Sequence, residues 1–174
     1  MRVLLVAVIW AMLSAGAEAQ ASYTTYGWGC GNWGGATQPA TLWCTYTPKI
    51  GASIEVHFLG PMYVPTWRSS RIFPFLITGL SRTNVGGVAL PFPINWGPIG
   101  GANCMLWCSA EFFVQIWSVP NGDRGSLVLQ IPNNPALVGV TLYHQWYLQY
   151  HLTWSGGIEG FYILSNGGMM TIGQ

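Results

Sequence analysis

The chain has 174 residues and a formal net charge of +1 at pH 7, and only 6% of its residues are charged, against a typical value of about 25%. Disordered proteins are polar and charged, so this composition excludes a disordered chain, and the lack of a basic stripe argues against a nucleic-acid partner. A net charge near zero gives little repulsion between copies, which favours self-association.

The N-terminus has the pattern of a targeting segment. Arg2 precedes the apolar run Val3 to Leu13, and Ala17-Glu18-Ala19 fits a small-x-small cleavage site. The apolar run is shorter than the ~20 residues that span a bilayer, and later apolar runs are broken by Gly, Pro or polar residues. We therefore expect a signal peptide over residues 1–19, one domain over residues 20–174 and a secreted or surface-exposed product without a transmembrane segment.

Strand and turn signals recur along the chain, whereas helical signals are nearly absent. Ser53 to Leu59 alternates, with Ile54, Val56 and Phe58 on one face and Glu55 and His57 on the other. The segment 72–78 is mostly apolar and predicts a buried strand. The segment 105–119 predicts one long or two short strands.

Two turns are expected further along. Residues 118–125 contain Asn121-Gly122, which supplies the positive φ angles of a tight hairpin and predicts that a strand near Val119 pairs with a strand at Leu127 to Ile131. Ser165 to Gly168 predicts a turn between strands at Gly160 to Leu164 and Met169 to Ile172.

One short helical turn interrupts this pattern, in "PNNPALVG". Asn133 or Asn134 can cap it, Pro135 fits its first position, and Gly139 can end it. We expect a crossover between strands. Short, evenly spaced strands indicate an all-β sandwich or barrel, and we favour a single antiparallel β-sandwich.

The segment from Thr141 to Leu152 is the clearest strand because it alternates strictly. Even positions from Leu142 to Leu152 are apolar or aromatic, apart from His144, and predict a core face. Odd positions form an uncharged strip that suits another subunit or a glycan, unless another part of the chain covers it. The strip is the candidate binding site: Tyr143, Gln145, Tyr147, Gln149 and His151.

Five segments resemble an uncharacterised family of exported bacterial all-β proteins. They begin with "YGWGCGNWGGATQPATL", similar to the family's Tyr-Gly-x-Gly-Cys start, and continue with "SRTNVGGVALPFPI" and "ANCMLW". "IPNNPALVGVTLYHQW" resembles the family's Ile-Pro-Asn-Asn-Pro-x-Leu-x-Gly segment, and "LSNGGMMTIG" its C-terminal strand pair. The resemblance implies a fold and a compartment, and it carries over no catalytic residue.

Four cysteines in an exported chain predict two disulfides. Cys104 and Cys108 lie four residues apart on a predicted strand, roughly 13 Å along it, which is too far to bond each other. The resemblance implies that Cys30 pairs with Cys104, which leaves Cys44 for Cys108. A four-cysteine zinc site is the rival interpretation, but the spacings lack Cys-x-x-Cys knuckles.

No constellation for catalysis, a metal or a cofactor is expected. Three histidines, His57, His144 and His151, could suggest a metal, but His144 and His151 lie on opposite faces of one strand and cannot share a metal ion without a bulge. Nothing in the sequence pairs two of the acidic residues at glycosidase spacing, and no nucleophile elbow, His-Glu-x-x-His or phosphate loop is present. The acidic residues after the predicted cleavage site are Glu55, Glu111, Asp123 and Glu159.

Two functions fit these features. The first is a structural or interaction protein of the cell exterior that assembles through uncharged aromatic surfaces, with itself or with an envelope partner. The second is a carbohydrate-binding module, because aromatic rings can stack on sugars and Gln amides can bind hydroxyl groups. Self-association favours the first, and polysaccharide binding by a monomer favours the second.

Overall fold

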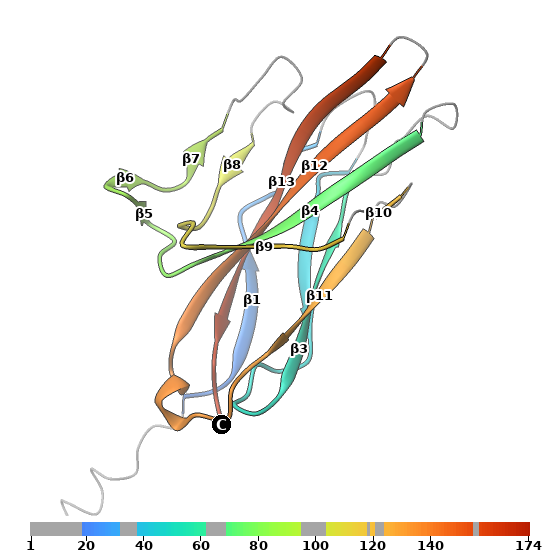
Figure 1. Cartoon of the computed structure of the whole chain (residues 1–174). Coiled ribbons are helices and arrows are strands. Elements are labelled where there is room, and N and C mark those ends of the chain that lie inside the picture. The colour runs from blue at the N-terminus through green and yellow to red at the C-terminus, as the bar shows by residue number, and fades with distance from the viewer. Residues whose placement is uncertain are drawn as a thin grey trace, which may run out of the picture.

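The protein is an all-β sandwich made of a large and a small antiparallel sheet (Figure 1). The computed structural model describes residues 19–31, 38–61, 69–94, 104–117, 119–120, 124–154 and 157–174. In the large sheet the strand order is β1-β13-β12-β4-β10, and β9 also pairs with β4. The small sheet has the order β11-β3-β2. The all-β sandwich predicted from the sequence is thus confirmed.

The strands of the large sheet include the longest in the protein. They are β1 (Ser22–Tyr26), β4 (Ser69–Gly79), β9 (Phe112–Gln115), β10 (Val119–Pro120), β12 (Thr141–Trp154) and β13 (Gly157–Thr171). The small sheet contains β2 (Thr41–Thr45), β3 (Ser53–Leu59) and β11 (Arg124–Gln130).

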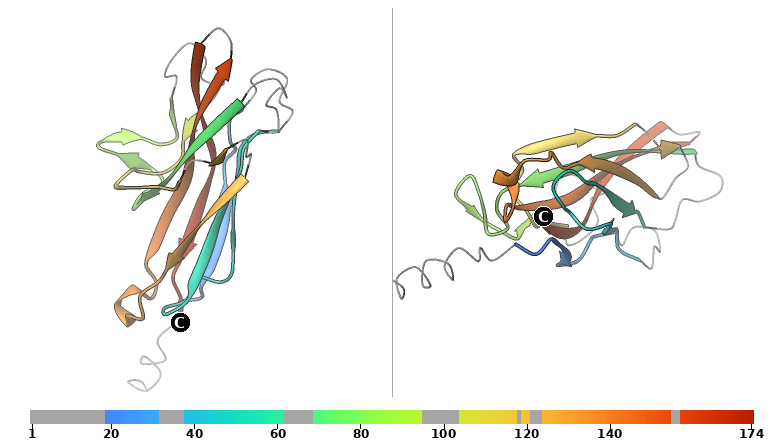
Figure 2. Two further views of the ribbon diagram at one scale, coloured as in Figure 1. Left: turned by 45° about the vertical axis from the view of Figure 1, so that its right-hand side comes forward. Right: turned by 90° about the horizontal axis from the view of Figure 1, so that it is seen from below.

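Four short strands form an arm that projects from the sandwich (Figures 1 and 2). They pair as β5 with β6 and β7 with β8. Their bounds are β5 (Asn84–Val85), β6 (Val88–Ala89), β7 (Phe92–Pro93) and β8 (Met105–Leu106).

The core lies between the two sheets and follows the alternation of the sequence. Ile54, Val56 and Phe58 of β3 are fully buried, and they face Trp146 and Leu148 of β12 across the sandwich, with the rings of Phe58 and Trp146 5.0 Å apart. The even positions of β12 from 144 to 150 are buried, which confirms this part of the predicted core face. Leu142 is only partly buried.

The predicted helical crossover is confirmed as the 3-10 helix η1 (Pro135–Leu137), which connects β11 of the small sheet to β12 of the large sheet. The Asn134 side chain accepts a hydrogen bond from the backbone N–H of Ala136 at 3.0 Å. Gly139 has a φ of 85°, which glycine tolerates and most residues do not.

Two predicted connections are wrong. The strand at Val119 pairs with Ile72 of β4, whereas β11 pairs with β3, so the strands on either side of 121–123 belong to different sheets and form no hairpin. The Asn121-Gly122 turn itself lies outside the described residues.

The predicted turn at Ser165 to Gly168 is instead a bulge inside the continuous strand β13. The register with β12 shifts between the pairs Gln145–Gly167 and Tyr147–Leu164. The Ser165 hydroxyl accepts the backbone N–H of Trp146 at 2.9 Å, so the bulge keeps this buried donor satisfied. A Cβ at Gly168 would lie 2.2 Å from the Tyr23 hydroxyl, so this position requires glycine for close packing and not for a turn.

The disulfide Cys30–Cys104 joins the segment after β1 to the segment before β8, as the family resemblance implies. The residues that follow it, up to Ser109, cross the outer face of the large sheet. A Cβ built on Gly79 of β4 would lie 2.1 Å from the Ser109 carbonyl oxygen, so the two backbones are in direct contact. Among the residues that the structure describes, no helix is long and apolar enough to cross a membrane, and the disulfide is compatible with an extracellular protein.

Candidate functional site

The strip predicted on β12 does not form one exposed face, because Gln145 is completely buried. Its Oε1 accepts the backbone N–H of Trp107 at 2.9 Å, and its Nε2 donates to the carbonyl oxygens of Met105 and Ser165 at 2.8 and 2.7 Å. The amide thus attaches the 104–109 segment to the large sheet. Gln145 is a structural residue, and its prediction as a binding residue is wrong.

Tyr143 is also covered in part by the same region. Its ring packs edge-on against Tyr26, 6.4 Å between centroids, and Tyr26 packs in the same way on Trp107 at 6.2 Å. The Tyr26 hydroxyl donates to the Trp107 carbonyl oxygen at 2.9 Å. The segment that covers Tyr143 therefore belongs to the same chain, and its Trp107 lies 36 residues before Tyr143 in the sequence.

The far half of the strip joins other rings in an aromatic face on the outside of the large sheet. The ring centroid of Tyr147 lies 5.7 Å from that of Phe75 and 5.8 Å from that of Tyr162. The ring centroids of His151 and Phe73 are 4.9 Å apart. These residues are half-buried, and burial raises the pKa of the Tyr147 phenol. We define the aromatic face as Phe73, Phe75, Tyr147, Gln149, His151 and Tyr162.

A second apolar surface follows β9 and was not singled out from the sequence. Phe112 and Phe113 are 59% and 60% exposed, Val114 is 40% exposed, and Trp117 just after the strand is 94% exposed. In the described part of the chain, β4 is the only strand that pairs with β9. We call these four residues the apolar edge.

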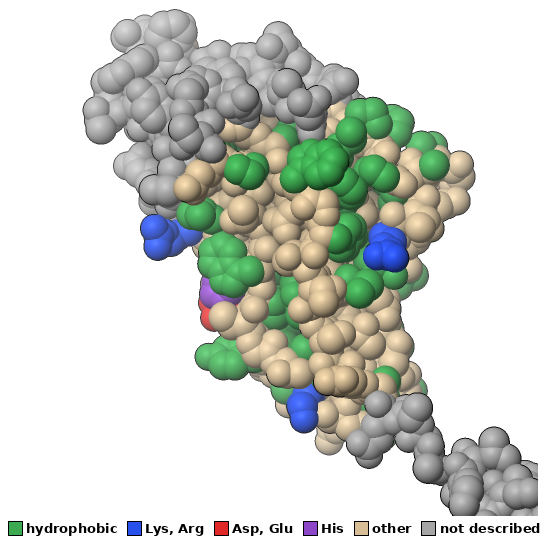
Figure 3. Space-filling view, turned by 180° about the vertical axis from the view of Figure 1, so that it is seen from behind, with side chains coloured by type: hydrophobic (Ala, Val, Ile, Leu, Met, Phe, Trp, Pro, Cys, Tyr) green, Lys and Arg blue, Asp and Glu red, His purple; other side chains and the backbone are tan. Residues whose placement is uncertain are grey.

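A third feature lies on the outer face of the small sheet, where Trp43, His57 and Ser126 face one another across β2, β3 and β11. The Trp43 and His57 rings are stacked, with centroids 5.0 Å and planes 6° apart. His57 Nε2 lies 3.0 Å from the Thr45 hydroxyl and 3.7 Å from a Glu55 carboxylate oxygen. In Figure 3, histidine and acidic side chains lie side by side next to exposed hydrophobic ones.

A hollow of about 360 Å³ adjoins this stack. Its lining comprises Trp43, His57, Phe58, Leu59, Arg124, Gly125 and Ser126. A hydroxyl, an imidazole and a guanidinium thus line the same space as an exposed indole, a mixture of polar and aromatic groups that is typical of ligand sites. The sequence showed that His57 faces outward but gave no reason to bring Trp43 next to it.

The predicted second disulfide is not formed, because Cys44 and Cys108 are free thiols. Cys44 pairs with Val56 of the buried row, so it lies on the inner side of the small sheet, whereas Cys108 belongs to the segment that crosses the outside of the large sheet. Burial raises the pKa of Cys44 to about 11 and of Cys108 to about 12. Neither thiol is activated as a nucleophile.

His144 is buried, as expected for a core histidine, and its Nδ1 lies 3.0 Å from the Thr78 hydroxyl. Burial lowers its pKa to about 4. Within the described ranges, no three His, Cys, Asp or Glu side chains are grouped so as to hold a metal ion.

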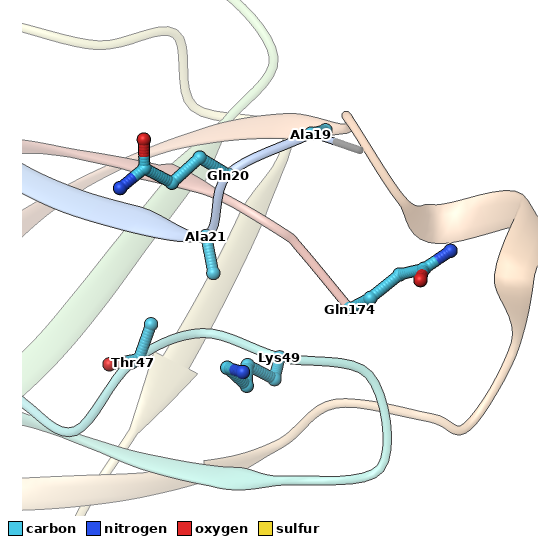
Figure 4. Close-up of a pocket in the computed structure, with 6 residues that line it drawn as sticks. All are labelled: Ala19, Gln20, Ala21, Thr47, Lys49 and Gln174. Atoms are coloured by element: carbon cyan, nitrogen blue, oxygen red, sulfur yellow. The ribbon is translucent and has the colours of Figure 1, made fainter. Parts of the chain in front are cut away.

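A hollow of about 410 Å³ lies where the two ends of the described chain meet (Figure 4). Ala19 and Gln20, which flank the predicted cleavage site, line it together with Gln174. Lys49 also lines it, and it forms a β-bridge to Gly173. Among the residues that line this hollow, Lys49 has the one charged side chain and none is aromatic, so the side chains offer little chemistry for binding a ligand.

No protein-family model matches the chain, and neither curated proteins nor solved structures give a significant match. The resemblance to exported all-β proteins therefore stays a prediction that rests on the quoted segments. Function has to be argued from the three surfaces described above.

Proposed function

We propose that this is a structural or interaction protein of the cell exterior that associates with further copies of itself through the apolar edge. The observation that carries the proposal is the exposure of Phe112, Phe113, Val114 and Trp117 on and beside an edge strand. A hydrophobic edge strand offers unpaired backbone groups and apolar side chains together, which favours strand pairing between chains.

Proteins that remain monomeric normally protect such an edge with Lys, Pro or an inward-pointing charge. Here β9 itself, Phe-Phe-Val-Gln, contains none of these. A β9 edge that pairs antiparallel with its copy would form a twofold dimer and extend the large sheet across both subunits. Because the chain has a net charge near zero, electrostatic repulsion between two copies is weak.

Export supports the same proposal. The targeting pattern at residues 1–19 and the Cys30–Cys104 disulfide both suit an oxidising exterior compartment. The aromatic face lies on the same sheet as β9 and could extend the contact or meet an envelope partner.

The experiment is sedimentation velocity of the mature protein over a concentration series. We expect a concentration-dependent increase in sedimentation coefficient that Val114→Lys abolishes, because a lysine ammonium would be desolvated in the interface. Val88→Lys is the matched control, since Val88 is 46% exposed on β6 of the arm. A wild-type protein that stays monomeric throughout, or two variants that behave alike, would refute the proposal.

A further inference from the structure

We propose that the outer face of the small sheet carries a carbohydrate site, in which a pyranose ring of an oligosaccharide stacks on Trp43. We call it the Trp43 pocket and define it by Trp43, His57, Leu59, Arg124 and Ser126. It is independent of the proposed self-association, which uses β9 of the other sheet. It also differs from the predicted strip on β12, in which the side chain of Gln145 is already hydrogen-bonded inside the protein.

The indole of Trp43 is held in a fixed orientation. Trp43 is 39% exposed, and its contact with the parallel His57 ring supports it from one side. His57 is held in turn by the Thr45 hydroxyl and by the Glu55 carboxylate. A preorganised aromatic ring loses little conformational freedom when a sugar ring stacks on it, so little of the binding free energy is lost.

Polar groups also line the pocket beside the ring. The Ser126 hydroxyl donates its hydrogen to Glu55 Oε1, so its oxygen lone pairs are oriented to accept from a ligand. Arg124, two residues along the same strand, has only donors in its guanidinium group. Sugar hydroxyls donate and accept at once, and the C–H groups of a pyranose ring are apolar, so the pocket matches both properties.

The volume and the charge of the pocket also suit a sugar ring. A volume of about 360 Å³ is at the small end of ligand pockets and suits one ring with its neighbours outside. Among the described residues, Arg124 is the only lysine or arginine that lines it, which is too little positive charge for a polyphosphate. Most of the lining surface is apolar, and the hydroxyl, imidazole and guanidinium groups add polar contacts, which suits the mixed surface of a sugar ring.

The test uses the mature, disulfide-bonded protein and three probes: cellohexaose, chitohexaose and hexagalacturonate. Binding is followed by calorimetry and by the shift of the indole N–H signals in NMR spectra. We expect at least one probe to bind at up to millimolar concentration, and Trp43→Ala to weaken its binding at least tenfold. The neutral and acidic probes distinguish hydroxyl recognition from recognition of a carboxylate by Arg124.

Trp28→Ala is the matched control, because Trp28 is a 58% exposed tryptophan that belongs neither to the Trp43 pocket nor to the apolar edge. We expect it to bind like the wild type. Ser126→Ala should weaken binding several-fold without changing the unfolding midpoint by more than a surface substitution does. Failure of all three probes to bind, or equal binding by Trp43→Ala and the wild type, would overturn the proposal. Neither result would alter the sedimentation behaviour on which the proposed function depends.

Discussion

The side chain of Gln145 and the backbone of Trp107 are joined by a hydrogen bond of 2.9 Å, although they come from segments 38 residues apart. Together with the bonds to Met105 and Ser165, this contact uses both ends of the amide. A residue that alternation assigns to the surface is thus a buried connection between the large sheet and the segment that covers it.

Gln145→Ala is therefore expected to be destabilising. It leaves a buried carbonyl oxygen, a part-buried carbonyl oxygen and a part-buried N–H without this partner, and a buried unsatisfied group costs ~1–3 kcal/mol. We expect a loss of at least about 3 kcal/mol in the free energy of unfolding, measured by chemical denaturation. Gln149→Ala on the same strand should cost less than about 1 kcal/mol. Equal losses would show that the burial of Gln145 is not what matters.

Trp146→Ala tests the core. Trp146 is fully buried against Phe58, and its indole N–H donates to the His57 carbonyl oxygen at 3.0 Å. Removing it should cost roughly 3–5 kcal/mol, as large-to-small core changes do. The half-buried Tyr147 contacts Phe75 and Tyr162, so Tyr147→Ala should cost an intermediate amount, about 1–2 kcal/mol. Denaturation midpoints in the reverse order would contradict the assignment of the two faces.

Stability should fall in acid because of His144. Its folded-state pKa is about 4, below the value of about 6.5 in an unfolded chain. Between these values only the unfolded chain takes up the proton. The stabilisation is therefore complete above pH 6.5 and is lost as the pH falls to 4, by about 3 kcal/mol.

The measurement is the free energy of unfolding at several pH values for the wild type and His144→Gln. The variant retains a hydrogen-bonding side chain for Thr78 but does not titrate. Its curve should be flatter between pH 4 and 6.5. Parallel curves for the two proteins would mean that other groups cause the pH dependence.

The cysteines give a further prediction, which corrects the sequence-based expectation of no free thiols. Thiol titration of the oxidised, denatured protein should find two reactive thiols per chain, Cys44 and Cys108. In the folded protein both should react slowly near pH 8, because burial raises their pKa to about 11 and 12. Reduction of Cys30–Cys104, which closes a loop with a sequence separation of 74, should cost about 4 kcal/mol. Finding no free thiols would contradict the structure.

The sequence predicted what depends on local periodicity. The faces of β3 and most of β12 follow from alternation, and the η1 crossover follows from Asn134 and Pro135, because these signals act within a few residues. Gln145 could not be predicted in this way, since its burial depends on where residues 104–109 cross the sheet. The hairpin prediction at 121–122 failed for a similar reason, because the strands on either side enter different sheets.

The candidate sites also depend on contacts between distant strands. Phe112 and Phe113 have the sequence pattern of an ordinary apolar strand, and only the topology shows that β9 lies at an edge. Trp43 and His57 are 14 residues apart in sequence, and the register of β2 on β3 brings them face to face. Side chains that meet across strands are determined by register, which a single sequence specifies only weakly.

The most direct test of association through the apolar edge is hydrogen exchange of the mature wild-type protein at low and high concentration. If copies pair along β9, the backbone N–H groups of residues 112–115 that point away from β4 should become more protected as the concentration rises, because pairing with a second copy satisfies them. The amides of β11, at the edge of the small sheet, should exchange at the same rate at both concentrations. Unchanged exchange in β9, or new protection confined to other strands, would contradict the account.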